Sequence, residues 1–209
     1  MTRVNQAGSP WRSGRSRHRD RGLKREAVVR TAAQAFNARG YHNTSLDDVA
    51  AALGVTKPTV YYYVANKEQL LFECFCAGLE PIRTAVREAL AAEGPARARL
   101  MRVVSDYAAA IASDYGWCMV RAVDHDLGAE TAQHVRALKS EIDQGIRQLI
   151  RDGITDGSIQ HCDPKVASFA IAGALNWIAH WYRDGQPMSA PQVAEAFVGL
   201  FDGAMAPRS

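Results

Sequence analysis

Apolar residues recur at the spacing of an α-helix, three or four positions apart, from about residue 23 to the end of the chain. No stretch shows the sustained apolar and polar alternation that is typical of half-buried strands. Gly and Pro separate the periodic segments, at points where helices commonly begin or end. The pattern predicts an all-α fold of about nine helices, at residues 23–38, 44–53, 56–64, 66–92, 96–113, 117–126, 129–155, 164–183 and 190–205.

The second and third of these segments are short and flank a tight turn at Gly54, whose backbone freedom suits such a turn. Their apolar residues fall on one face of each segment: Leu46, Val49, Ala50 and Leu53 in the first, Val60 and Val64 in the second. Two short helices pinned together across a turn form a helix-turn-helix. The run Thr44-Ser45-Leu46-Asp47 is expected to cap the first helix, and Asn66 with Gln69 the helix that follows the motif.

Packing of this kind leaves one face of the third helix free, and in a helix-turn-helix that helix enters the major groove of DNA. Hydroxyls at the start of the preceding helix could hold a phosphate at its positive end. The predicted DNA-binding residues are Thr44, Ser45, Lys57, Pro58, Thr59, Tyr61, Tyr62 and Lys67. The alternatives left open are a capping role alone for Thr44, partial burial of Tyr61 and Tyr63, and a merely solvated charge at Lys67.

The formal net charge of +3 hides an asymmetry along the chain. Residues 1–67 hold 12 basic and four acidic residues, a net +8, whereas the remainder holds 13 basic and 18 acidic residues, a net −5. A basic front end favours a polyanionic partner. Residues 1–20 lack apolar periodicity and are rich in Arg, Ser and Gly, so we predict a flexible basic arm. It either contacts DNA phosphates or a minor groove, or is a solvated tail without a role.

Residues 36–71 resemble the DNA-binding domain of the TetR family of transcriptional regulators. The positions that match the family pattern at fixed spacing are Gly40, Tyr41, Thr44, Ser45, Leu46, Val49, Ala50, Gly54, Val55, Thr56, Val60, Tyr61, Tyr63, Lys67, Glu68 and Leu70. Val64 departs from it, because the family usually has Phe or Tyr there.

The resemblance implies a helix-turn-helix domain at residues 21–67 and a helical ligand-binding and dimerisation domain at residues 68–209. It also implies a homodimer on a near-palindromic DNA operator, most often a repressor that a small effector releases. An activator remains the alternative within the same family.

The larger domain contains polar and aromatic groups within apolar sequence, as ligand pockets do. The predicted ligand-binding residues are Tyr107, Trp117, Arg121, His125, Asn176 and His180. Arg121 and His125 are one helical turn apart and could receive a carboxylate, a phosphate or a thioester carbonyl. The alternative is that Arg121 pairs with Asp124 or Asp126 and that His125 lies at the surface. An apolar or acyl-type metabolite, such as a coenzyme A thioester, is the first candidate ligand, and a multidrug-type lipophile is the second.

The last two predicted helices carry apolar stripes with small residues that allow close helix approach. The predicted dimer-interface residues are Phe169, Gly173, Trp177, Trp181, Phe197 and Phe201. The alternative is that they only fill the core of one subunit.

Other classes of protein are disfavoured by the sequence. It has no P-loop, G-x-S-x-G or H-E-x-x-H motif, and its four cysteines lack zinc-site spacing, so we expect no enzyme, no cofactor and no metal. A helical protein-binding adaptor would not need the arrangement between Thr44 and Lys67. The chain shows no secretory signal, and its longest apolar stretch is broken by Asn176 and His180. A cytoplasmic location and no membrane partner are therefore expected.

Overall fold

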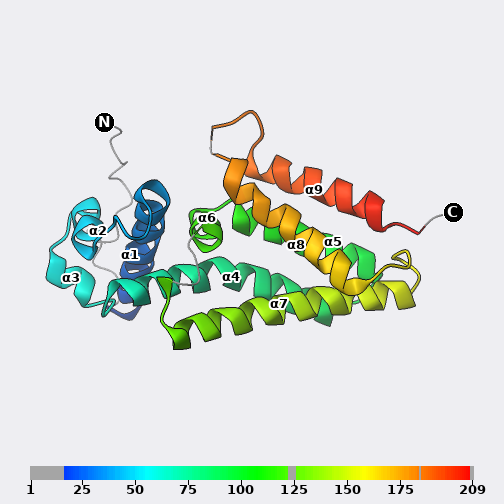
Figure 1. The fold of residues 1–209 in the computed structure, drawn as a ribbon, viewed down its shortest axis with the longest axis horizontal. Helices are drawn as coiled ribbons and strands as arrows, with labels where there is room; N and C mark the ends of the chain where they lie inside the picture. The colour runs from blue at the N-terminus through cyan, green and yellow to red at the C-terminus, as the bar shows by residue number, and fades with distance from the viewer. Residues whose placement is uncertain (1–16, 122–125, 184, 208–209) are drawn as a thin grey trace. The chain divides into compact units, whose positions relative to one another are not determined.

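The computed structural model describes residues 17–121, 126–183 and 185–207, with side chains from residue 21 onward. Within these residues the chain forms helices and no strand, which confirms the all-α prediction (Figure 1). The helices are α1 (Arg17–Arg39), α2 (Leu46–Leu53), α3 (Lys57–Tyr61), α4 (Lys67–Ala91), α5 (Ala96–Ile111), α6 (Asp114–Arg121), α7 (Ala129–Thr155), α8 (Pro164–Trp181) and α9 (Ala190–Met205). None of the described helices is long and apolar enough to cross a membrane.

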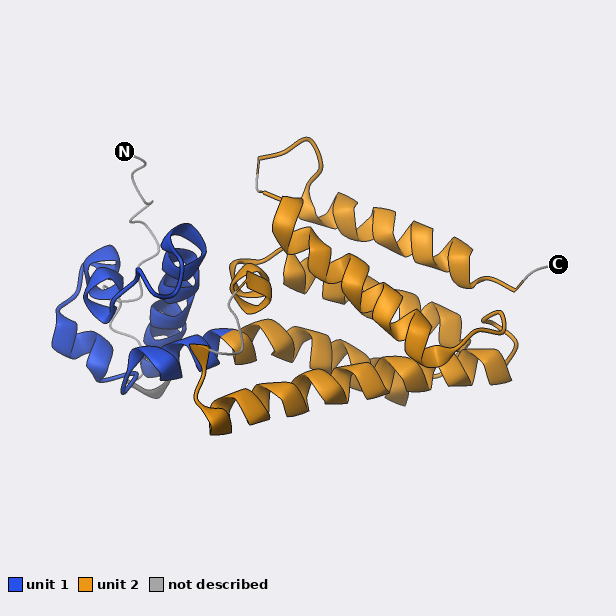
Figure 2. Ribbon diagram, in the orientation of Figure 1, with its two compact units in different colours: residues 1–74 blue, residues 75–209 orange. Residues whose placement is uncertain are grey.

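The chain divides into two compact units, Met1–Cys74 and Phe75–Ser209 (Figure 2). The division falls inside α4, whereas the sequence analysis placed a domain boundary after residue 67. Helix α4 is a single element of 25 residues that begins in the first unit and ends in the second.

The predicted starts of α1 and α6 need correction. Helix α1 begins at Arg17, so residues 17–20 of the predicted flexible arm are helical, and residues 1–16 lie outside the described residues. A helical turn can form without apolar periodicity, because Arg is itself a good helix former. Helix α6 begins at Asp114 rather than near residue 117, because the Ser113 hydroxyl accepts the backbone N–H of Gly116 (3.2 Å) and caps it.

Gly116 was expected to separate two helices, but it lies in the first turn of α6. A Cβ atom at this position would lie 2.3 Å from the backbone oxygen of Ala110. Glycine is therefore required here by the close approach of α6 to the end of α5.

The first unit is built around α1, which packs against α2, which in turn packs against α3. Its core contains Val28, Ala32, Phe36, Val49, Val60, Val64, Leu70 and Leu71, all buried. Val64 thus fills the core as an aliphatic residue where the family pattern usually has an aromatic one.

The second unit is centred on α5, which packs against α6, α7, α8 and α9. Its largest fully buried side chains include Leu100, Ile111, Ile146, Leu149, Ile171, Leu175 and Ile178. The C-terminal part of α4 approaches α7 at Gly145, where a Cβ atom would lie 2.2 Å from the Val86 side chain. Arg83 of α4 also forms an ion pair with Glu141 of α7 (3.1 Å).

Candidate DNA-contact face and effector site

Helix α2 is capped by Ser45, one residue later than predicted. The Ser45 hydroxyl accepts the backbone N–H of Asp48 (3.1 Å), and the Ser45 N–H donates to the Asp48 carboxylate (2.8 Å). This reciprocal pair is a capping box. The hydrogen bonds from Ser45, followed by the charge of Arg39, hold the pKa of Asp48 below its ordinary value.

Thr44 is placed differently from the sequence prediction. Its side chain is only 2% exposed, and its hydroxyl lies 2.9 Å from the Gly40 carbonyl and 3.3 Å from that of Ala35. The hydroxyl therefore ties the end of α1 to the start of α2. Because a buried hydroxyl bonded to backbone cannot reach a phosphate, we correct the prediction and remove the Thr44 side chain from the candidate contact face.

Helix α3 is a single short turn held by one buried residue, Val60. It ends at Tyr61, three residues before the predicted end. Pro58 occupies its first turn, where the missing N–H costs nothing. The Thr59 hydroxyl is hydrogen-bonded to that of Thr56 (2.8 Å). Lys57, Pro58 and Tyr61 of the same helix are exposed.

Four of the predicted DNA-binding residues are exposed on α3 and at its C-cap: Lys57, Pro58, Tyr61 and, as the cap, Tyr62. Tyr62 is 64% exposed and packs edge-on against Tyr63. The Arg21 guanidinium of α1 lies over the Tyr62 ring, 5.2 Å from its centroid. Sequence reasoning missed Arg21, because nothing local links a residue of the first helix to one 41 positions later.

The cations near the motif have partners within the first unit. Lys57 Nζ pairs with Asp47 (2.9 Å) and lies 5.8 Å from the Tyr61 ring centroid. The bond to Asp47 raises the pKa of Lys57. Arg39 pairs with Asp48 (3.3 Å). The two acidic residues in the first turn of α2 are thereby matched by two cations.

Lys67 stands at the start of α4, directly after its cap. The backbone N–H of Gln69 donates to the Asn66 side chain (2.7 Å), which confirms Asn66 as the capping residue. Lys67 Nζ donates to the His42 carbonyl (3.3 Å) and lies 4.2 Å from the Tyr41 ring centroid. These contacts hold the ammonium group beside the loop that precedes α2.

In the second unit, two predicted ligand-binding residues meet between α5 and α8. The Tyr107 hydroxyl donates to the Asn176 side-chain oxygen (3.2 Å). Burial raises the pKa of Tyr107 to about 12, so the phenol is neutral at physiological pH. His180 is exposed, and its ring stacks on Trp177 with centroids 4.5 Å apart. His125 lies outside the described residues.

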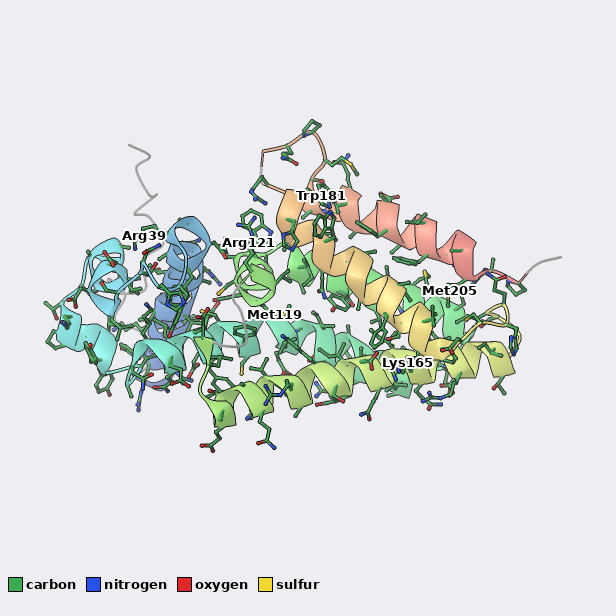
Figure 3. The ribbon with its side chains drawn as sticks, in the orientation of Figure 1. Arg39, Met119, Arg121, Lys165, Trp181 and Met205 are labelled. Atoms are coloured by element: carbon green, nitrogen blue, oxygen red, sulfur yellow. The ribbon has the colours of Figure 1, made fainter. Side chains whose placement is uncertain are left out.

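Trp117 and Arg121 of α6 meet a residue that was not among the predicted ones, Arg183, just beyond the end of α8. The guanidinium carbons of Arg121 and Arg183 lie 5.6 and 4.9 Å from the Trp117 ring centroid. Figure 3 labels Arg121 on α6, together with Trp181 on α8. The described residues contain no cluster of His, Cys, Asp or Glu that could hold a metal ion.

The predicted interface residues divide into exposed and buried ones. On α8, Phe169 is 56% and Trp177 62% exposed, Gly173 is exposed, and Trp181 is less so. Leu200 on α9 and Val166 on α8 are exposed to a similar extent. Val166 was not predicted as an interface residue. Phe197 is half-buried. Phe201 is only 9% exposed, because α9 packs against α5, so its prediction as an interface residue is corrected to a core position.

Comparison with known families matches both units of the chain. The family model of bacterial regulatory proteins of the tetR family covers residues 28–74. The tetracyclin repressor-like C-terminal domain covers residues 93–204. The chain belongs to the TetR family. It is therefore a transcriptional regulator with a DNA-binding helix-turn-helix and a ligand-binding C-terminal domain, and the matching families are not families of enzymes.

Individual relatives span nearly the whole chain. The transcriptional repressor KstR2 of Rhodococcus jostii is 24% identical over 190 residues, 89% of this chain and 93% of that protein. The TetR-family regulator PfmR of Thermus thermophilus is 28% identical, with a TM-score of 0.76 over 83% of this chain and 95% of that one. AibR in complex with isovaleryl coenzyme A and operator DNA is 26% identical, with a TM-score of 0.73 over 85% and 97%.

Proposed function

We propose that the protein is a repressor that binds a near-palindromic operator as a homodimer, with α3 of each subunit in the major groove. The observation that carries this proposal is the exposed face of α3, where Tyr61, Tyr62 and Lys57 surround a single buried anchor, Val60. Tyrosine rings and hydroxyls can contact thymine methyl groups and base edges. The proposed contact residues are Ser45, Lys57, Pro58, Thr59, Tyr61, Tyr62 and Lys67.

The dimer is proposed to form through α8 and α9. Val166, Phe169 and Trp177 of α8 and Leu200 of α9 are large apolar side chains that stay exposed in the single subunit, as residues of an interface would be. Gly173 lies on the same helix, and a Cβ atom there would meet nothing within 4 Å, so a partner helix could approach closely. A two-fold dimer would place the recognition helices roughly 34–36 Å apart, one turn of DNA, or a multiple of it.

The effector is proposed to be an apolar or acyl-type molecule, with a coenzyme A thioester as the first candidate. Its support is the complex of AibR with isovaleryl coenzyme A, together with the hydrogen bond between the buried Tyr107 and the half-buried Asn176 within a largely apolar helix bundle. We keep residues 21–67 as the DNA-binding domain and residues 68–209 as the domain that binds the effector and dimerises.

Release is proposed to act through α4. This helix is continuous from Lys67, a proposed DNA contact, to Ala91 in the second unit. An effector that favours a different position of α4 would change the spacing of the two recognition helices. Coupling through an element shared by two sites is typically worth about a 5- to 150-fold change in affinity.

The test is selection of DNA bound by the purified full-length protein, followed by titration of the operator complex with isovaleryl coenzyme A and longer acyl thioesters. We expect an inverted repeat, a dimer by light scattering, and at least about a fivefold loss of operator affinity on effector addition. A selected site without two-fold symmetry, or a monomer on DNA, would overturn the dimeric repressor. An operator complex that no acyl thioester weakens would overturn the effector class alone.

A further inference from the structure

Two arginines from different segments of the second unit converge on one indole ring. Arg121 ends α6, Arg183 follows α8, and both guanidinium groups lie over the Trp117 ring. The Arg121 Nε donates to the Ala179 carbonyl at 3.2 Å, and an Arg183 amino group lies 3.5 Å from the same oxygen. Because they share one ring and one carbonyl, the two cations are held close together.

No carboxylate in the described part of the chain forms an ion pair with Arg121 or Arg183. Burial lowers the pKa of Arg121, and the charge of Arg183 lowers it further. Within the described residues, no carboxylate offsets these two effects on Arg121.

The C-terminus of α8 offsets part of the positive charge of the two arginines. Cations are favoured at a helix C-terminus, and Arg183 also donates to the Tyr182 carbonyl (2.5 Å). The helix end carries only about half a negative charge, whereas the two guanidinium groups carry two positive ones. Among the residues that the structure describes, the site therefore keeps a net positive charge.

The same place holds an unpaired donor. The Trp117 Nε1 atom is buried and has no hydrogen-bond acceptor among the described residues. A buried polar group without a partner is rare in native proteins and often marks a functional position.

We propose that Arg121 and Arg183, stacked on Trp117, form the phosphate-binding part of the effector site. The inference rests on the proposed function and extends it: the effector carries a phosphate or pyrophosphate group, as coenzyme A does, and is not a free carboxylic acid. Arg121 is exposed and Arg183 half-buried, so a large charged group can reach them from solvent.

Phosphate fits this pair better than carboxylate does. A guanidinium group donates two parallel hydrogen bonds to an oxyanion, so two such groups offer four donors. One carboxylate has a single charge and two oxygens, whereas a pyrophosphate matches both the charge and the donors of two arginines.

The test is calorimetric titration of the full-length protein and the variants Arg121→Gln and Arg183→Gln. The ligands are isovaleryl coenzyme A, coenzyme A, sodium pyrophosphate, and the isovaleryl thioester of N-acetylcysteamine, which lacks phosphate. Each substitution should weaken binding of isovaleryl coenzyme A about tenfold or more, as expected for a lost charge-assisted hydrogen bond. Binding of the phosphate-free thioester should not change.

Arg87→Gln is the matched control, because Arg87 is an exposed arginine of the same unit that donates only to Thr84 in the described structure. It removes the same charge and should leave every affinity unchanged. Thermal melting of each variant checks that the fold is retained.

The outcomes separate this inference from the proposed function. If isovaleryl coenzyme A binds the unmodified protein and both arginine variants equally, the phosphate site is overturned and the effector class stands. If coenzyme A or pyrophosphate binds in an arginine-dependent way but the isovaleryl group adds nothing, the phosphate site stands and the acyl effector is overturned. If none of the phosphate ligands binds, or if the substitutions weaken operator binding without effector, the phosphate site is overturned.

Discussion

Cations in the helix-turn-helix and cations beside the end of α8 have opposite surroundings. In the first unit, Lys57 is paired with Asp47 and Arg39 with Asp48. In the second unit, Arg121 and Arg183 share an indole and a carbonyl and have no carboxylate partner among the described residues.

The difference teaches that net charge is a poor guide to where an anion binds. In residues 1–67, with their net +8, the cations of the helix-turn-helix are already paired, so DNA phosphates must compete with Asp47 for Lys57. Residues 68–209, with their net −5, contain a pair of neighbouring arginines that have no carboxylate partner in the described part of the chain. Sequence reading of DNA is accordingly assigned to largely uncharged groups on α3, and anion binding in the second unit to two arginines.

The largest expected effect comes from removing an uncharged contact. Tyr62→Ala should lower operator affinity about 5- to 150-fold, the value of one good base contact, and lower affinity for unrelated DNA much less. Binding is measured by fluorescence anisotropy on both DNAs, with Tyr62→Phe as the control that keeps the ring. Equal losses on operator and unrelated DNA would mean that Tyr62 does not read sequence.

Removal of a proposed phosphate contact should behave differently. Lys67→Ala should weaken binding to all sequences alike, and the slope of log affinity against log salt should become shallower by about one per subunit. Titrations over a series of salt concentrations measure the slope, and Lys67→Arg should retain it. An unchanged slope would assign the Lys67 ammonium to the His42 carbonyl and the Tyr41 ring alone.

Removal of the carboxylate that pairs with Lys57 should raise DNA affinity, by less than the two previous variants lower it. Asp47→Asn releases Lys57 from its ion pair and removes a negative charge near the proposed contact face. We expect a gain in affinity for any DNA of roughly three- to tenfold and a steeper salt dependence. Glu26→Gln removes a similar exposed charge from α1, and its effect should be smaller. If the two variants behave alike, the pairing of Lys57 has no influence on DNA binding.

The smallest expected effects concern stability without effector. Arg121→Gln removes one of two neighbouring cations and should leave the free energy of unfolding unchanged or raise it by a few tenths of a kcal/mol, whereas Arg39→Gln breaks an exposed ion pair and should lower it by a similar amount. Denaturant unfolding measures both. A loss for Arg121→Gln as large as that for Arg39→Gln would show that the contacts of Arg121 with the Ala179 carbonyl and the Trp117 ring outweigh its repulsion by Arg183.

Local sequence rules accounted for much of the fold. Helices α7 and α9 begin and end at the predicted residues, because Gly128 and Ser189 precede their first turns and the apolar period is regular. The rules failed where two neighbouring residues could both cap the same helix. Thr44 and Ser45 both carry hydroxyls, and only the packed structure shows that Ser45 caps α2 while Thr44 is buried.

The candidate sites were less predictable, because they depend on contacts between distant segments. Arg121 was identified from its position on a helix, but its partner Arg183 lies 62 residues later and has no local signal. Phe201 carries the same apolar character as Leu200, and only the direction in which α9 packs separates a core residue from an exposed one.

The most direct test of the account is whether isovaleryl coenzyme A releases the protein from its selected operator. Fluorescence anisotropy of labelled operator DNA at fixed salt measures the release. The unmodified protein should dissociate from DNA as the thioester is added. The double variant Arg121→Gln/Arg183→Gln should bind the operator with unchanged affinity and need at least about tenfold more thioester for release. Release of both proteins at the same thioester concentration would contradict the account.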